Sequence, residues 1–189
     1  MKRTKGCYGY LQRQKKKEVV KTIAYFALSL AIFAMGYFST GTKTNLLTIV
    51  AVLGCLPASK SAVSMFMYLK AGVCSDDCYR EVEKYEESDD TLILYDLYLT
   101  SYLKNFQISA MAVKNNALCG YTEDAKCDLA AGEKHIADML RQNGYDGLTV
   151  KLFRDRAKFI ERLGQMNGQP ERMPEKEQTL AQLIKDISL

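Results

Sequence analysis

The chain has 189 residues with 26 Lys and Arg, 22 Asp and Glu, and a formal net charge of +4. Residues 1–70 carry eleven basic residues and one acid, Glu18, whereas residues 71–189 carry 15 basic and 21 acidic residues. The second part is therefore mildly acidic. This excludes the basic face that a general nucleic-acid-binding domain presents to phosphate, and no nucleic-acid partner is expected.

The first 21 residues form a basic segment that leads into an uncharged run. Eight Lys or Arg fall within residues 1–21, and residues 22–38 carry no charge. About 20 apolar residues are needed to cross a bilayer, so residues 19–39 are predicted to form a first transmembrane helix. Basic flanks are retained in the cytoplasm, which places the N-terminus there. A cleaved signal peptide is the alternative, but residues 38–41 offer no small-residue cleavage site.

A second apolar segment, residues 45–69, is predicted to return through the membrane. It is interrupted by Pro57 and Lys60, which leaves two interpretations. Either the segment is one helix, or it breaks at Pro57 and its second half lies along the membrane surface. A spanning segment makes a hairpin that returns the following domain to the cytoplasm, whereas a non-spanning segment would leave that domain outside.

Lys60 is the residue in these two runs that could mark an intramembrane functional site. A Lys at mid-depth is costly and usually functional, but neither run contains an acidic partner for it. We therefore expect Lys60 to lie at the membrane interface, with its ammonium group in water.

The remaining sequence, 71–164, is predicted to be a small α+β domain with elements in the order α-β-β-β-α-β-α. Apolar positions at helical spacing, period-two alternation and capping residues mark these elements. The expected helices cover 76–90, 129–142 and a segment capped by Asp155, and the expected strands cover 91–102, 105–114, 117–122 and 148–153.

The strand pattern predicts a sheet with one solvent-exposed face. In residues 91–102 the side chains of Ile93, Tyr95, Leu97 and Leu99 are expected to point one way and those of Asp96, Tyr98 and Thr100 the other, and residues 105–114 alternate again. Asn115-Asn116 suits a tight turn before the third strand. The helices are then expected to cover the other face.

The C-terminal part is predicted to be a linker followed by an amphipathic helix. Residues 165–174 contain Gly168, Pro170 and Pro174, and residues 175–189 place Leu180, Leu183, Ile184 and Ile187 at helical spacing. The stripe is expected to pack on its own domain or on a second copy of the chain, with a foreign protein partner as the further possibility.

The catalytic inventory is small. The sequence has no G-x-S-x-G, no phosphate-binding G-x-x-x-x-G-K-[ST], no G-x-G-x-x-G and no H-E-x-x-H. Its single histidine, His135, falls inside an expected helix and is interpreted as a partly exposed helical residue. No catalytic residue, cofactor or metal ligand is therefore assigned.

Four cysteines lie in the domain: Cys74, Cys78, Cys119 and Cys127. They could bind zinc, or form two disulfides in an extracellular domain. Their spacings are not those of tight zinc knuckles, and the N-terminal charge favours a reducing compartment. We expect reduced, unpaired thiols.

The element order α-β-β-β-α-β resembles the core of restriction-endonuclease-like folds. Those enzymes hold a catalytic metal with an Asp and an E-x-K motif on neighbouring strands. Here Asp96 lies on the first strand, Ala112 precedes Lys114 where Glu is required, and Glu123 and Lys126 are one residue too far apart. The resemblance is thus one of topology. It implies an alternative function, a membrane-tethered metal-dependent nuclease or phosphoesterase with Asp96 and Glu123 as displaced ligands.

A local basic patch completes the candidates. It contains Arg154, Arg156, Lys158 and Arg162, diluted by two acids, and is interpreted as a solvated helix face that could also meet anionic lipids. Taken together, the sequence predicts a membrane-anchored protein whose cytoplasmic domain acts as an interaction or regulatory module.

Overall fold

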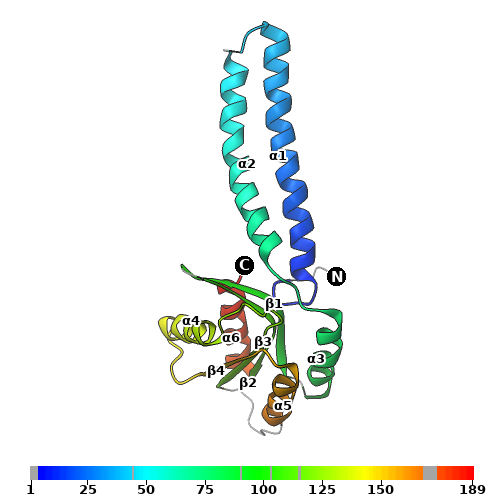
Figure 1. The fold of residues 1–189 in the computed structure, drawn as a ribbon. Helices are drawn as coiled ribbons and strands as arrows, with labels where there is room; N and C mark the ends of the chain where they lie inside the picture. Colours follow the sequence, from blue (N-terminus) through cyan, green and yellow to red (C-terminus); the bar gives the residue numbers. More distant parts are fainter. Residues whose placement is uncertain (1–3, 44, 90, 103, 115, 168–173) are drawn as a thin grey trace. The chain divides into compact units, whose positions relative to one another are not determined.

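The computed structural model describes residues 4–43, 45–89, 91–102, 104–114, 116–167 and 174–189. These residues divide into two compact units. One comprises Met1–Tyr10 together with Gly72–Leu189, and the other comprises Leu11–Ala71. The fold is mixed α+β, with six helices and one four-stranded sheet in the described residues (Figure 1).

The unit Leu11–Ala71 is a pair of long helices joined by a short turn. Helix α1 spans Tyr10–Thr40 and α2 spans Leu46–Lys70. At 1.5 Å per residue they are about 46 and 37 Å long. Helix α2 continues through Pro57 without a break, so the interpretation of a helix broken there is wrong.

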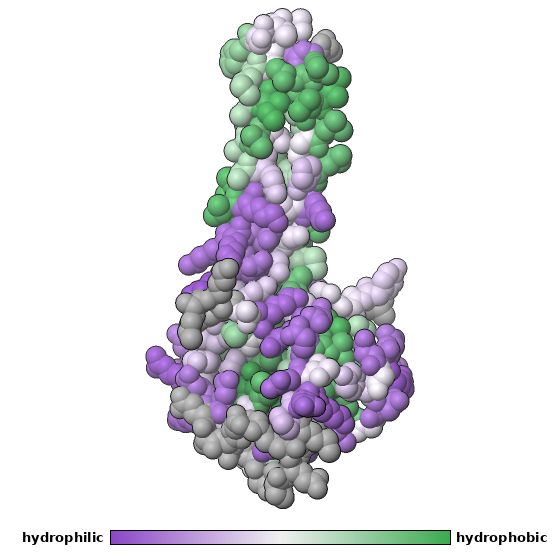
Figure 2. Space-filling model, turned by 180° about the vertical axis from the view of Figure 1, so that it is seen from behind, coloured by the Kyte–Doolittle hydropathy of each residue, from purple (hydrophilic) through white to green (hydrophobic). Residues whose placement is uncertain are grey.

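The two helices meet through small side chains. Ala51, Ala58 and Ser61 of α2 are buried, as are Ser29 and Gly36 of α1. A Cβ atom on Gly36 would lie 2.7 Å from the Cβ atom of Leu47, so glycine permits the close approach there. The large apolar side chains instead face outward, and Figure 2 shows them as a green region on the part of the hairpin nearest its turn.

The other unit is a three-layer domain built on a sheet with strand order β1-β2-β3-β4. The first two pairings are antiparallel and β3 pairs with β4 in parallel. Its elements are α3 Asp76–Asp89, β1 Leu92–Thr100, β2 Asn105–Lys114, β3 Ala117–Tyr121, α4 Leu129–Gln142, β4 Thr149–Phe153, α5 Arg156–Asn167 and α6 Pro174–Ile187. The predicted order of elements is therefore confirmed.

Helices cover both faces of this sheet (Figure 1). Ile136 of α4 and Ile184 of α6 pack in one core, whereas Val82 of α3 and Phe159 of α5 pack in the other. The expectation that one sheet face is exposed to water is therefore wrong. Seven of the nine residues of β1 are buried, and the strand sequence is apolar at odd and even positions because both of its faces lie in a core.

The alternation along β1 and β2 also differs from the prediction. Ile93 and Tyr95 pack in the core with α3 and α5, but Leu97 and Leu99 pack in the opposite core. The change occurs at Asp96, whose φ of 56° lies in the left-handed region and rotates the following residues. On β2 the same change of face falls between Ile108 and Ala110, which pair with Leu97 and Tyr95, the two neighbours of Asp96.

The remaining differences concern element ends. Helix α5 continues to Asn167, three residues into the predicted linker 165–174, because Leu163 and Met166 still face the core. Residues 168–173 and Asn115 of the predicted turn lie outside the described residues. The apolar stripe of α6 packs against the sheet of its own domain, so a partner would have to contact another surface.

Candidate functional site

Asp96 occupies the point where β1 changes face. Its side chain is buried, with 4 % exposure, and both carboxylate oxygens accept backbone hydrogen bonds. Oδ2 accepts from the N–H of Gly9 at 2.8 Å, and Oδ1 accepts from the N–H of Cys74 at 2.8 Å. Gly9 precedes α1 and Cys74 follows α2. One carboxylate therefore binds the chain just before it leaves the domain and just after it returns.

The N-terminal segment, residues 4–9, is fastened to the domain by further contacts. The N–H of Tyr95 donates to the carbonyl of Gly6 at 2.8 Å. The ammonium group of Lys5 donates to the carbonyls of Lys185 and Ser188 at 3.1 and 2.7 Å, at the C-terminal end of α6. These carbonyls carry the negative end of the helix dipole, so a cation is favoured there. Residues 4–9 are thus an integral part of the domain.

Glu123 binds the residue after Cys74. The N–H of Ser75 donates to Oε2 of Glu123 at 2.9 Å, and its hydroxyl donates to Oε1 at 2.5 Å. Asp96 and Glu123, the two acids of the nuclease alternative, are therefore brought together by neighbouring backbone amides. In this arrangement three of their four carboxylate oxygens accept hydrogen bonds that anchor residues 74–75, and the fourth, Oδ2 of Asp96, accepts from Gly9. We call Asp96, Glu123, Gly9, Cys74 and Ser75 the Asp96 junction.

The four domain cysteines do not converge on one point. Cys74, Cys78 and Cys119 lie in the core with α3 and α5, whereas Cys127 lies in the opposite core. A hydrogen bond with Cys78, followed by burial, raises the pKa of the Cys74 thiol, and burial raises the pKa of Cys119 to about 12. These thiols are therefore protonated at neutral pH. Across the described residues, no cluster of three or more His, Cys, Asp or Glu side chains has a geometry that could hold a metal ion.

Three tyrosines lie beside the Asp96 junction. The rings of Tyr8 and Tyr79 stack with centroids 4.0 Å apart, and the ring of Tyr95 stands at 66° to that of Tyr79. The hydroxyl of Tyr8 donates to Asp76 and that of Tyr95 donates to Glu86 at 3.3 Å. The hydrogen bond to Asp76 raises the pKa of Tyr8, and burial raises the pKa of Tyr95, so both phenols stay protonated. A groove of about 250 Å³ opens along these rings.

His135 and the basic patch have structural surroundings. His135 is half-buried, with its ring 5.5 Å from that of Phe106, as expected for a helical residue that packs at an edge of the core. Arg154 donates to the carbonyl of Cys127 at 2.7 Å, and Arg156 pairs with Glu81 at 3.1 Å. These arginines are thus engaged within the domain.

In the helix pair, polar groups meet at one level. The hydroxyl oxygens of Thr22 and Ser61 lie 2.9 Å apart and are buried between α1 and α2. Lys21 and Lys60 are the preceding residues on the two helices, so they share this level, and both are exposed. Lys21 pairs with Glu18 at 3.5 Å. Lys60 therefore lies at the boundary between the uncharged and the charged part of the helix pair.

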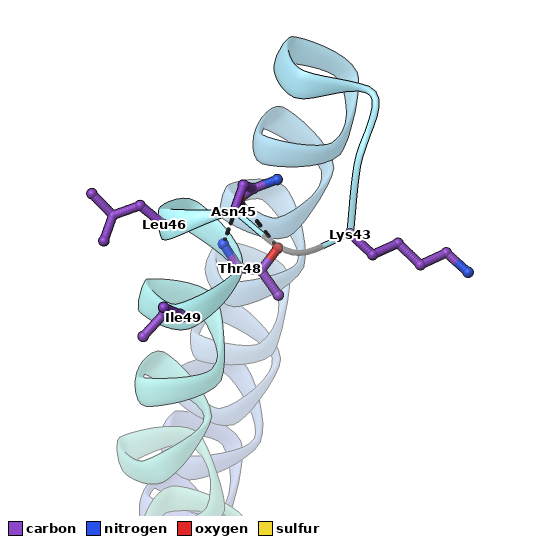
Figure 3. A pocket seen from close by; sticks show the side chains of 5 residues that line it. All are labelled: Lys43, Asn45, Leu46, Thr48 and Ile49. Atoms are coloured by element: carbon purple, nitrogen blue, oxygen red, sulfur yellow. Dashed lines mark hydrogen bonds between the residues drawn. The ribbon is translucent and has the colours of Figure 1, made fainter.

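The turn between the helices forms a further hollow, and the side chains that line it point in different directions. Asn45 caps α2 by accepting the N–H of Thr48 at 2.9 Å. Figure 3 shows the side chain of Lys43 pointing away from Leu46 and Ile49. Asn45 also donates to the hydroxyl of Thr40 and to the carbonyl of Thr42, so the polar groups of the described turn residues bind one another and do not define a ligand site.

Comparison with known proteins gives no assignment. No protein-family model, no curated protein and no solved structure matches this chain.

Sequence reasoning did not find the role of residues 4–9 or of Asp96. The signal available for the segment was Gly6-Cys7-Tyr8-Gly9, an uncharged and glycine-punctuated stretch inside the basic N-terminus. Both glycines adopt positive φ, which supports the turns that carry the segment onto β1.

Proposed function

We propose that this chain is an integral membrane protein in which α1 and α2 form a transmembrane hairpin. The α+β domain lies in the cytoplasm and acts as an interaction or regulatory module. The hydrogen bonds that Asp96 accepts from Gly9 and Cys74 carry this proposal, because they place the residues that precede α1 and follow α2 in the same folded domain.

The length and surface of the helices support the membrane assignment. Both are long and apolar enough to cross a bilayer, and only 17 % of the apolar window of each is buried. A core helix of a water-soluble domain would be mostly buried. Their contacts through Ala, Gly and Ser are also typical of membrane helices, which approach closely through small residues.

The position of Thr22 and Ser61 along the two helices supports a membrane boundary at these residues. From there to the turn, α1 extends about 27 Å and α2 about 22 Å, close to the hydrocarbon thickness of about 30 Å. Lys21 and Lys60 would then reach the interface, where a charge is tolerated. This explains how a helix that contains Lys60 can insert.

The N-terminal segment supports an even number of crossings. Residues 4–9 and the domain belong to one compact unit, so they occupy the same side of any membrane. A single crossing between residues 10 and 72 would separate them and break the contacts of Lys5, Gly6 and Gly9. The hairpin is the arrangement that retains these contacts.

The charge distribution supports a cytoplasmic domain. The eight basic residues among the first 21 precede the first apolar run, whereas the turn between the helices carries only Lys43. Basic residues close to membrane helices favour the cytoplasmic side.

An interaction module is favoured over the nuclease alternative because its two acids, Asp96 and Glu123, accept hydrogen bonds from backbone amides. This is tested by photo-crosslinking the full-length protein in membranes of the cells that express it, from a probe at the exposed position Tyr102. A discrete crosslinked protein supports the module. Metal-dependent phosphodiester cleavage by the purified full-length protein, abolished in Glu123→Gln with the fold retained, would establish the nuclease alternative instead.

A further inference from the structure

Lysines gather on the helix pair just beyond its uncharged part. We call Lys15, Lys16, Lys17, Lys21 and Lys60 the lysine collar. Four of the five are exposed and Lys15 is half-buried, and Figure 2 shows hydrophilic side chains, in purple, next to the green region of the hairpin. Among the described residues, Lys21 is the one member of the collar that forms an ion pair. The collar therefore presents uncompensated positive charge at its surface.

The single acid of residues 1–70 does not reduce this surface charge. Glu18 is 8 % exposed and lies one turn before Thr22, on the same buried face of α1. Its carboxylate is 3.5 Å from Nζ of Lys21. The exposed charges on α1 between residues 11 and 21 are therefore all positive.

An exposed apolar face of α2 accompanies the collar. Val63, Phe66 and Leu69 are each more than half exposed, and they recur every three residues, so they lie on one side of α2. Nζ of Lys70 lies 4.6 Å from the centre of the Phe66 ring. Cationic and large apolar side chains thus share this part of the hairpin, a combination typical of segments that bind at a membrane interface.

With the proposed membrane boundary at Thr22 and Ser61, the collar lies at the depth of the lipid head groups. Along α1, Lys17 is four residues beyond Lys21 and Lys15 is six residues beyond it, which corresponds to about 6 and 9 Å. The head-group layer on each side of a bilayer is about 5–8 Å thick. A lysine side chain bends toward its preferred surroundings, so the ammonium groups of the collar would reach the lipid phosphates.

We propose that the lysine collar binds the head groups of anionic phospholipids and enriches these lipids around the hairpin. Charge complementarity favours this occupant, because each lysine near an anionic membrane surface strengthens the attraction about fivefold. The apolar face of Val63, Phe66 and Leu69 favours a lipid over a water-soluble polyanion, since lipid chains cover apolar surface that a polyanion leaves in water. This inference rests on the transmembrane hairpin proposed above and adds the class of lipid that contacts it.

A tryptophan placed beside the collar tests this proposal. The chain contains no tryptophan, so a single introduced one reports the lipids around it. Ile23 is exposed on α1 and lies seven residues after Lys16, which is about two turns along the same side. Ile23→Trp therefore reports the lipids beneath the collar, whereas Phe38→Trp, at an exposed position near the turn, reports the other end of the hairpin.

The two full-length variants are reconstituted in vesicles of phosphatidylcholine and phosphatidylglycerol, and quenching is measured with one or the other lipid brominated in its acyl chains. At Ile23→Trp, the binding constant of phosphatidylglycerol relative to phosphatidylcholine should be about three or more. At Phe38→Trp it should be close to one, because the turn between the helices carries only Lys43.

The outcomes separate this proposal from the hairpin on which it rests. Quenching of both tryptophans with a relative binding constant of one at both positions would overturn the proposal. It would leave the hairpin intact and favour an acidic protein segment as the occupant of the collar. Absence of quenching at both positions would contradict the hairpin itself, and the lipid assignment with it.

Substitutions assign the effect to the collar. The Ile23→Trp chain is further changed at three positions: Lys15→Gln, Lys16→Gln and Lys17→Gln. These changes should bring the relative binding constant close to one. The matched control removes the same charge from three exposed lysines of the domain and should leave the constant unchanged: Lys84→Gln, Lys126→Gln and Lys134→Gln. An unchanged constant in the collar variant, or an equal loss in the control, would contradict the assignment of lipid binding to the collar.

Discussion

The side-chain oxygens of Thr22 and Ser61 lie 2.9 Å apart in the buried contact between α1 and α2. This hydrogen bond joins the two helices at the point where the uncharged part of α1 begins. It also aligns Lys21 with Lys60, which accounts for the position of a lysine inside an otherwise apolar helix. Together with the close approach of Gly36 to Leu47, this contact defines the register of the two helices.

The register predicts an efficient crosslink. In a background with the exposed Cys7 and Cys55 changed to Ser, Thr22→Cys with Ser61→Cys should form an intramolecular disulfide when isolated membranes are oxidised. The two side chains already touch, and a disulfide needs Cβ atoms about 3.5–4.5 Å apart. Faster gel mobility that is reversed by reductant measures the product.

The matched control is Thr22→Cys with Ser59→Cys. Ser59 lies two residues away on α2 and is exposed, so it faces a different direction. Equal crosslinking of both pairs, or crosslinking of the control alone, would show that the helices pack in another register.

Replacement of Asp96 by Asn should loosen the Asp96 junction. Asn tolerates the left-handed backbone, so Asp96→Asn should keep the local conformation. Its side chain has only one acceptor oxygen, so the N–H of Gly9 or of Cys74 would face the amide NH2 group and lose its acceptor. A buried N–H left without an acceptor costs about 1–3 kcal/mol. We expect faster hydrogen exchange at the Gly9 or Cys74 amide and a lower unfolding midpoint of the full-length protein.

Asp77→Asn is the control for that substitution, because Asp77 is exposed on α3. It should leave both the exchange rates and the midpoint unchanged. If Asp96→Asn behaves like Asp77→Asn, the carboxylate does not hold the two segments.

The helix cap at Asp128 predicts a dependence on pH. The ammonium group of Lys104, 2.7 Å away, and the N–H of Ala131 lower the pKa of Asp128 below its ordinary value. A carboxyl whose pKa falls on folding stabilises the fold above its unfolded pKa near 3.9, and that contribution is lost as pH falls through the lowered value. Asp128→Ala should therefore lower the melting temperature at pH 7.

The difference between Asp128→Ala and the wild type should shrink as the pH is lowered from 5 toward 3. Asp128→Asn retains a cap without a charge, so its melting temperature should depend less on pH than that of the wild type. Thermal scans across this pH range provide the measurement. A difference between Asp128→Ala and wild type that is constant across the range would argue against an ionised cap.

The elements of the domain could be predicted because their signals are local. Asp128 and Asp155 mark helix starts, and Asn143-Gly144 marks a helix end, with Gly144 at positive φ. Such signals require only neighbouring residues, so the sequence places them to within a few positions.

The change of face in β1 and the N-terminal contacts could not be predicted in this way. In the run Leu92–Thr100, apolar residues occupy both parities, so an alternation that switches at Asp96 looks the same as one that continues. The hydrogen bonds of Asp96 reach Gly9 and Cys74, which are 87 and 22 residues away. No local pattern marks a partner at that separation.

The most direct test of the account is to map which side of the membrane three exposed positions occupy. The native domain cysteines are 0–2 % exposed and would be labelled poorly on either side. In a chain with Cys7 and Cys55 changed to Ser, single cysteines are therefore placed at Thr42 in the turn, at Tyr102 in the domain, or returned at position 7. A membrane-impermeant maleimide is then applied to intact cells and to permeabilised cells.

In the proposed topology the cysteine at position 42 reacts in intact cells, whereas those at positions 7 and 102 react only after permeabilisation. Labelling of positions 7 and 102 on opposite sides would contradict the hairpin and the fastening of residues 4–9 to the domain.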